Sequence, residues 1–231
     1  SLCSDESRWL LNRTRHSTIP DTNPEPQLFF DSPFTLFLLL INVLVSGYAL
    51  YFDPSLINTL SFRPKRILKE KEYYRMLTGG FVHGGLGHLA FNMFTLFFFG
   101  PVLETSLGSA EFLIIFFGAE FAAHGFTLWK HRDSSTYAAV GASGAISGVV
   151  VSFSLLYPTY KIYLMLIPIG IPAWLFALGF IGFSAYAMNK RDQSRMGGIA
   201  HEAHLGGAIG GLLLTLVMVP SALGRFTSQM G

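Results

Sequence analysis

Cysteine and charge are both scarce in this chain, and each scarcity excludes a class of protein. Its only cysteine is Cys3, so neither an intrachain disulfide nor a cysteine-rich metal site is expected. Charged residues make up 13% of the 231 positions. The lysines and arginines are scattered over loops, so the chain has no basic footprint for nucleic acid.

Hydrophobic residues make up 51% of the sequence and gather in runs long enough to cross a bilayer. The sequence therefore predicts an all-α, polytopic membrane protein with six transmembrane helices. The fifth run contains two prolines and a glycine, which predict a bend. The predicted spans are residues 34–51, 86–103, 112–129, 145–157, 162–188 and 204–219.

These runs divide the chain into three parts. Residues 1–32 form a polar N-terminal arm, residues 33–219 the membrane domain and residues 220–231 a short C-terminal tail. The arm has arginines and prolines but no long apolar run, so we expect no cleavable signal peptide.

Three polar residues start alternate spans. His88, Ser143 and His204 lie at the beginnings of the second, fourth and sixth predicted helices, so counting crossings puts all three on one side of the bilayer. Glycines on the fourth and sixth helices predict that these two helices pack closely, which would bring Ser143 and His204 together. The glycines are Gly144, Gly148, Gly206, Gly207, Gly210 and Gly211.

The paired serine and histidine predict nucleophilic catalysis. A serine hydroxyl attacks efficiently when a neutral imidazole removes its proton, so Ser143 is the candidate nucleophile and His204 its base. Gly141 and Gly144 let the backbone turn sharply around the serine. The free N–H groups of a helix start favour an oxyanion there.

Further donors are predicted on the second helix. His88 and Asn92 are four residues apart and share a helix face, so both can point at one oxyanion, and His83 lies just before them. Glu202 and Glu104 are poorly placed to complete a triad, which favours a Ser-His dyad. The i,i+4 histidine pair of a zinc protease is absent around Glu202, so we expect no metal and no cofactor.

In these motifs the chain resembles the rhomboid family of intramembrane serine proteases, over roughly residues 34–219. The matching elements, in family order, are Tyr74-Arg75, His83-x4-His88-x3-Asn92, Glu104-x3-Gly108-Ser109, Gly-Ala-Ser-Gly-Ala at 141–145 and Ala-His-Leu-Gly-Gly at 203–207.

The resemblance implies a six-helix bundle that cuts transmembrane segments of other membrane proteins, with lipid and those substrates as partners. It implies Ser143 as nucleophile, His204 as base, His88 and Asn92 as oxyanion contributors, and a structural role for His83. The fifth helix and the loop at 189–199 would form the substrate gate. Ser147 departs from the family, which often has an aromatic residue there, stacked on the base.

The membrane orientation stays open. The side holding the first loop carries 11 lysines and arginines and the other side five, which by the positive-inside rule makes the first-loop side cytoplasmic. The resemblance implies the opposite for a bacterial cell membrane, the predicted location.

Less specific interpretations are also kept. A rhomboid-like protein could bind or escort transmembrane helices without cutting them, and a small transporter is a remote alternative. Glu120 and His124 are predicted to hydrogen-bond each other within the third helix. The segment from Lys130 to Arg132 is predicted to be a solvated loop, and the many phenylalanines to face lipid.

Overall fold

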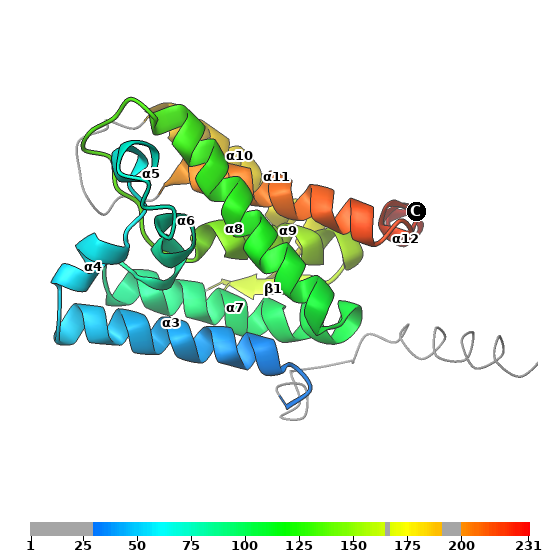
Figure 1. Ribbon diagram of the computed structural model, residues 1–231. Helices are drawn as coiled ribbons and strands as arrows, with labels where there is room; N and C mark the ends of the chain where they lie inside the picture. The colour runs from blue at the N-terminus through cyan, green and yellow to red at the C-terminus, as the bar shows by residue number, and fades with distance from the viewer. Residues whose placement is uncertain (1–29, 165–166, 191–199) are drawn as a thin grey trace, which may run out of the picture.

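The computed structural model describes residues 30–164, 167–190 and 200–231. These residues form a helical bundle with one small β-hairpin (Figure 1). The prediction of a polytopic helical membrane protein is confirmed.

Three helices are long and apolar enough to cross a membrane. They are α3 (Pro33–Tyr51), α7 (Leu86–Leu107) and α8 (Ser109–His131). A bilayer requires about 20 apolar residues of helix, which each of them approaches or exceeds. Helix α3 lies beside α7 at the edge of the bundle (Figure 1), which leaves much of its surface for lipid.

The remaining helices of the bundle are shorter. They are α9 (Ser143–Leu156), α10 (Ala173–Lys190) and α11 (His201–Met218). Helix α11 is followed by α12 (Ala222–Met230), and the chain bends by 102° between them. If this bent pair is one span, up to four spans meet the length and composition test in the described residues. The count of six spans therefore stays a prediction.

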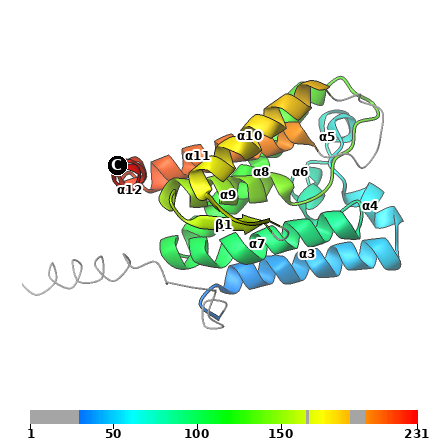
Figure 2. The ribbon, with the colours of Figure 1, turned by 180° about the vertical axis from the view of Figure 1, so that it is seen from behind.

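Helix α9 lies at the centre of the bundle. All of its residues from Gly144 to Leu156 are buried, and α7, α8, α10 and α11 pack around it. Helix α8 lies in front of α9 in Figure 1, and α10 covers it from the opposite side in Figure 2. A 14-residue helix is tolerated here because protein surrounds it on every side.

Glycines bring α9 and α11 into backbone contact. A Cβ added to Gly207 would overlap the carbonyl of Gly144, and one added to Gly211 would overlap the backbone of Gly148. Missing side chains allow this approach, so the predicted packing of the fourth and sixth helices is confirmed.

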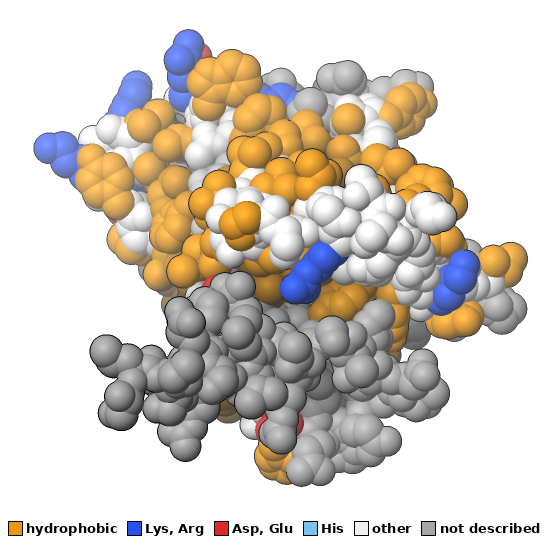
Figure 3. Space-filling model, turned by 90° about the vertical axis from the view of Figure 1, so that its right-hand side faces the viewer, with side chains coloured by type: hydrophobic (Ala, Val, Ile, Leu, Met, Phe, Trp, Pro, Cys, Tyr) orange, Lys and Arg blue, Asp and Glu red, His pale blue; other side chains and the backbone are white. Residues whose placement is uncertain are grey.

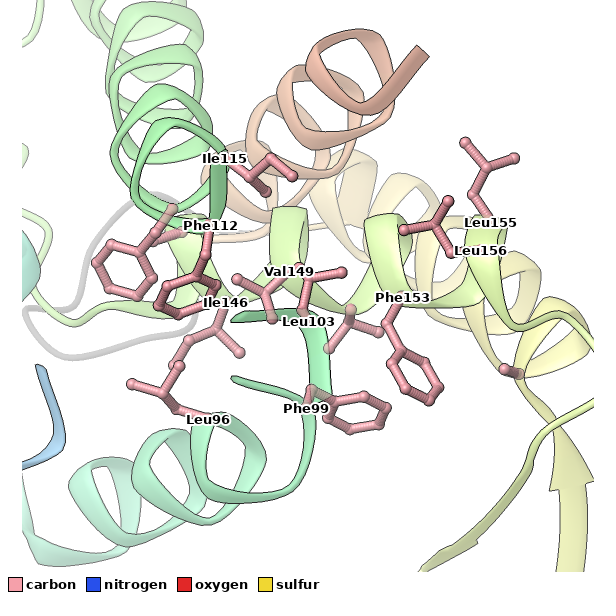
Figure 4. Close-up of a cluster of buried hydrophobic side chains, with 14 of the residues drawn as sticks. Leu96, Phe99, Leu103, Phe112, Ile115, Ile146, Val149, Phe153, Leu155 and Leu156 are labelled. Carbon is pink, nitrogen blue, oxygen red and sulfur yellow. The ribbon is translucent and has the colours of Figure 1, made fainter. Parts of the chain in front are cut away.

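Large apolar side chains fill the space between α7, α8 and α9 (Figure 4). Leu96, Phe99 and Leu103 of α7 meet Phe112 and Ile115 of α8. Residues of α9 project into the same cluster along its length, and Val149 is fully buried. This cluster fixes α9 relative to the two spanning helices.

The fifth predicted helix, residues 162–188, is wrong over its first part. Two antiparallel strands, β1 (Lys161–Leu164) and β2 (Ile167–Pro172), pair there instead, and α10 begins only at Ala173. Proline lacks the N–H that a helix interior requires, and this run has two prolines. Figure 2 shows β1 lying between α7 and α10.

Hydrophobic side chains predominate over the described part of the face shown in Figure 3, and charged side chains are few. Exposed large apolar residues occur on all the outer helices, among them Leu44 on α3, Phe91 on α7 and Leu178 on α10. An apolar exterior of this extent suits contact with lipid rather than water.

The long first loop folds into short helices against the bundle. These are α4 (Ser55–Leu60), α5 (Pro64–Lys69), α6 (Arg75–Thr78) and the 3-10 turn η2 (Gly79–Phe81). The Arg75 side chain, 2% exposed, donates to the carbonyls of Asn58 and Ser61 and pairs with Glu72. The same guanidinium, together with Arg66, lowers the pKa of the Glu72 carboxyl. Arg75 therefore anchors the loop, as the resemblance implies.

Candidate active site

Ser143 begins the central helix, where a short loop runs against the first loop. Phe62 and Ala139 exchange two backbone hydrogen bonds of 2.9 and 3.0 Å, and the Gly141 N–H donates to the Gly79 carbonyl at 2.9 Å. Gly141 has a φ of 106°, a conformation that favours glycine. The backbone thus turns at Gly141 and delivers a half-buried Ser143 to the first turn of α9.

His204 lies in the first turn of α11, at the end of that helix that packs against the start of α9. Gly144, next to Ser143, packs against the backbone of Ala203 and Gly207, and a Cβ at Gly144 would lie 3.8 Å from the Ala203 carbonyl. Since Ser143 and Gly144 are neighbours, as are Ala203 and His204, the glycine contact brings the two candidate catalytic residues to the same end of the α9–α11 interface.

His88 and Asn92 meet the serine loop from the other side. A Cβ at Gly141 would lie 2.5 Å from Cε1 of His88, 2.8 Å from its Nε2 and 3.4 Å from Nδ2 of Asn92. Both side chains come from the first turns of α7, where their four-residue spacing puts them on one face. The two predicted oxyanion donors therefore lie together beside Gly141, which precedes Ser143 by two residues in the sequence.

Asn92 is the more informative of the two. Its side chain is 2% exposed, and among the described residues its Nδ2 has no hydrogen-bond partner. Buried polar groups are nearly always paired, and an unpaired donor costs about 1–3 kcal/mol. An amide held in this state beside Gly141, two residues before Ser143, is suited to receive an oxygen that arrives with a substrate.

His83 links the serine loop to α3. The Ala142 N–H donates to Nε2 of His83 at 3.5 Å, and Nδ1 of His83 lies 2.8 Å from the Ser46 hydroxyl. Burial, with a contribution from His88, lowers the pKa of His83 to about 3, so the ring is neutral at pH 7. A neutral ring that accepts at Nε2 carries its proton on Nδ1 and donates it to Ser46, whose hydroxyl donates to the Phe81 carbonyl at 3.0 Å.

Glu120 and His124 of α8 hydrogen-bond to other elements, and the hydrogen bond predicted between them is not formed. Nδ1 of His124 lies 3.4 Å from Oε1 of Glu120, and among the described residues this oxygen has no hydrogen-bond partner. His124 instead donates to the Met76 carbonyl at 2.7 Å, and Glu120 Oε2 accepts the Ala145 N–H at 3.0 Å. Glu120 therefore occupies one of the free N–H groups in the first turn of α9, two residues after Ser143.

Both acids considered for a triad are engaged elsewhere. Glu104 accepts hydrogen bonds from the Thr35 N–H and hydroxyl, both at 2.7 Å, and from Ser109 at 2.8 Å, so it ties the start of α3 to the α7–α8 turn. Glu202 accepts from Nε2 of His131 at 2.9 Å and from the Tyr137 hydroxyl. Because both carboxylates have other partners, the site is still interpreted as a Ser-His dyad without a third, acidic member.

The pairing of Glu202 with His131 was missed by sequence reasoning, which took residues 130–132 for a solvated loop. His131 lies within α8, is buried, and stacks on the Tyr137 ring at 3.8 Å between centroids. Lys130 Nζ lies 3.9 Å from the other oxygen of Glu202. The pairing was hard to see because the partners are 71 residues apart, yet it holds the first turn of α11.

Aromatic rings surround the candidate base. Phe180 of α10 stacks on His204 with ring centroids 5.5 Å apart and planes 27° apart, and His201 meets His204 edge-on at 5.8 Å. Position 147, where the resemblance expects an aromatic residue, holds a buried serine whose hydroxyl donates to the Ser143 carbonyl. The loop at 191–199 from the predicted cap lies outside the described residues.

Fold and site together define a helical membrane protein with a serine, a histidine and one side-chain amide, unpaired among the described residues, near one end of its central helix. The profile of the rhomboid domain matches residues 70–221, well over half of the chain. The chain belongs to the rhomboid family, as the motifs indicated. Among its relatives are proteins that are named rhomboid proteases.

Three relatives illustrate the likeness. Over 192 residues the chain is 31% identical to Rhomboid protein 1, mitochondrial, of Saccharomyces cerevisiae, covering 80% of this chain and 54% of that protein. It is 32% identical over 155 residues to Rhomboid-like protein 14, mitochondrial, of Arabidopsis thaliana (62% and 46% covered). It is 28% identical over 220 residues to Rhomboid protease AarA of Providencia stuartii (82% and 74% covered). The chain spans about half the length of the first two.

Proposed function

We propose that this chain is an active serine protease that hydrolyses peptide bonds in or near transmembrane segments of other membrane proteins, with Ser143 and His204 as a catalytic dyad. The observation that carries the proposal is the backbone contact of Gly144 with Ala203 and Gly207. That contact brings the helix starts bearing the two residues together, and the nearby amide of Asn92 has no hydrogen-bond partner within the part of the chain that the structure describes.

The first chemical step is acylation. His204 takes the proton of the Ser143 hydroxyl as the oxygen attacks the scissile carbonyl, and the carbonyl oxygen becomes an oxyanion. The protonated His204 then gives its proton to the leaving amine, which releases one half of the substrate. A water molecule, deprotonated by His204, hydrolyses the acyl-enzyme and restores the serine.

The oxyanion is stabilised by donors from two helices. Nδ2 of Asn92 and the ring of His88 approach from α7, and the N–H of Ser143 lies at the start of α9, where a helix has free N–H groups. Two neighbouring N–H groups serve other partners, since Ala142 donates to His83 and Ala145 donates to Glu120. These two hydrogen bonds fix the loop. The N–H of Ser143, Nδ2 of Asn92 and the His88 ring then remain as donors for the substrate oxygen.

The substrate is a membrane-spanning helix that unwinds locally. A peptide bond in an intact helix has its carbonyl hydrogen-bonded and its faces covered, so residues with low helix propensity near the membrane face favour cleavage. A substrate segment with glycine or other small residues should be cut, and the same segment replaced by polyleucine should resist.

The proposed location follows the relatives. The names of the Saccharomyces cerevisiae and Arabidopsis thaliana proteins place them in mitochondria, which favours a mitochondrial membrane over the bacterial cell membrane predicted from the sequence. Fractionation of cells that express the tagged chain decides between the two.

The experiment uses the full chain in liposomes with a model substrate that carries one glycine-containing transmembrane segment. Cleavage is expected for the unaltered protein, and none for Ser143→Ala or His204→Ala with an unchanged melting temperature. Labelling by a fluorophosphonate separates the alternative: a folded protein that binds the segment but is neither labelled nor able to cut it is an escort, which contradicts the proposal.

A further inference from the structure

The orientation of the candidate base depends on a helix that does not carry either catalytic residue. The face of the Phe180 ring covers the imidazole of His204 from α10, with the centroids 5.5 Å apart. A stacked pair of this kind restricts both rings, because tilting either one loses contact area.

Residues on the serine helix do not supply an equivalent ring. Ser147, one turn after Ser143, is 2% exposed, and its hydroxyl is directed at the carbonyl of Ser143. His201 meets His204 edge-on, with planes 82° apart, and its own ring is contacted by Phe183, also from α10. The two phenylalanines that contact these histidines, Phe180 and Phe183, therefore both come from α10.

Helix α10 is itself loosely embedded. Its first turn joins the large core through Ala173 and Phe176. Beyond that turn, its buried contacts with α9 and α11 form a small cluster of Val151, Ala177 and Ala208, and its other face is open, with Leu178 60% and Phe183 62% exposed. The part of α10 beyond its first turn lies at the lipid boundary on a small buried cluster, so it can shift more readily than α8 or α11. A shift of α10 would withdraw Phe180 from His204.

We infer that Phe180 is a positioning residue for the His204 base, so that the efficiency of the dyad depends on where α10 lies. This rests on the proposed function of Ser143 and His204. Aromatic pairs contribute enough energy to account for a change of about 3- to 10-fold in the rate of a step that needs the imidazole aligned.

The test measures inactivation of the full chain in detergent by a fluorophosphonate bearing a rhodamine reporter, resolved into kinact and KI. Phe180→Leu removes the ring but keeps an apolar side chain, and Phe180→Tyr keeps the ring. We expect kinact to fall about 3- to 10-fold for Phe180→Leu at an unchanged KI, and to stay near the unaltered value for Phe180→Tyr. Phe180→Ala should lower kinact at least as much.

Leu178→Ala is the matched control, because it truncates an exposed apolar residue on the same helix. It should leave kinact unchanged. If Phe180 had only a structural role, its substitution would lower the melting temperature, and kinact would not be restored in Phe180→Tyr. If Phe180→Ala fails to fold, the comparison of Phe180→Leu with Phe180→Tyr still tests the inference.

Two results overturn the inference. The first is a kinact for Phe180→Leu equal to that of the unaltered protein while labelling still requires Ser143 and His204; this leaves the protease intact and removes the role of Phe180. The second is an equal loss in Leu178→Ala, which would show a general effect of α10. Absence of labelling in the unaltered protein would overturn the proposed function together with this inference.

Discussion

The proposed nucleophile and the proposed base are held in different ways. Ser143 stands on α9, whose backbone meets that of α11 at Gly144 and Gly207 and whose side chains fill the large cluster in Figure 4. The ring of His204 is instead stacked by Phe180, a side chain from the boundary helix α10.

Backbone contact leaves little freedom, whereas a ring stack can be made and broken. Because α9 is central and its loop is tied by His83 and Glu120, Ser143 and the proposed oxyanion donors are organised before a substrate arrives. The stacking on the His204 imidazole depends on the position of α10. The site thus combines a rigid half with an adjustable half, and the following substitutions separate the two.

The largest effect is expected from Gly207→Ala. The new methyl would overlap the carbonyl of Gly144, and forcing extra volume into a tight interface costs about 1–3 kcal/mol. Both the melting temperature and fluorophosphonate labelling should fall sharply. Gly179→Ala and Gly182→Ala on α10 are the matched controls, because nothing lies within 4 Å of a Cβ there. If the α10 variants lost as much stability as Gly207→Ala, the contrast between the two halves would be wrong.

Asn92→Ala should affect rate far more than stability. Loss of one oxyanion donor typically lowers the rate by about 100- to 1000-fold, while Nδ2 of Asn92 has no partner to lose among the described residues. The cleavage rate and melting temperature measure the two effects. Asn42→Ala removes another buried asparagine, on α3, and should leave cleavage unchanged; equal rates for Asn92→Ala and the unaltered protein would refute the oxyanion role.

Glu120 tests how the first turn of α9 is held. Glu120→Leu leaves the Ala145 N–H without its acceptor, and an unsatisfied buried donor costs about 1–3 kcal/mol. Glu120→Gln keeps an acceptor oxygen and should be milder. Denaturation of the purified protein gives the free energy of unfolding of each variant, which we expect to be lower for Glu120→Leu than for Glu120→Gln. A leucine variant as stable as the glutamine variant would mean that the contact with Ala145 contributes little.

His83 should produce the smallest effect, visible as a dependence of stability on pH. Its pKa is about 3 in the folded protein and about 6.5 in an unfolded chain, so the unfolded state binds more protons between these values. The contribution of His83 is complete above pH 6.5 and declines as pH falls toward 3. The melting temperature should therefore drop less between pH 7 and pH 4.5 in His83→Asn than in the unaltered protein, and identical drops would contradict the assignment.

The motifs were enough to name the candidate site residues, because each motif is a local pattern with a defined place on a helix. Ser143, His204, His88 and Asn92 were predicted from spacing and from the parity of crossings, and the glycines predicted the α9–α11 contact that relates them. The family followed from the same residues and is confirmed by the match over 70–221.

What the sequence could not predict depends on contacts between distant segments. Phe180 was grouped with phenylalanines expected to face lipid, since nothing local distinguishes a ring on a histidine from a ring in a bilayer. His131 was assigned to a loop because its partner Glu202 is remote in sequence. The hairpin at 161–172 was taken as helix because its hydrophobic run outweighed Pro168 and Pro172, the signal that could have identified it.

The central claim is that Ser143 and His204 form one reacting pair. A structure of the full chain after reaction with the fluorophosphonate tests it most directly, through the distance between Oγ of Ser143 and the nearest ring nitrogen of His204. We predict phosphorus bonded to Ser143 and a separation within hydrogen-bond reach, about 2.6–3.2 Å. An adduct on another residue, or an imidazole turned away from the serine and beyond contact, would contradict the account.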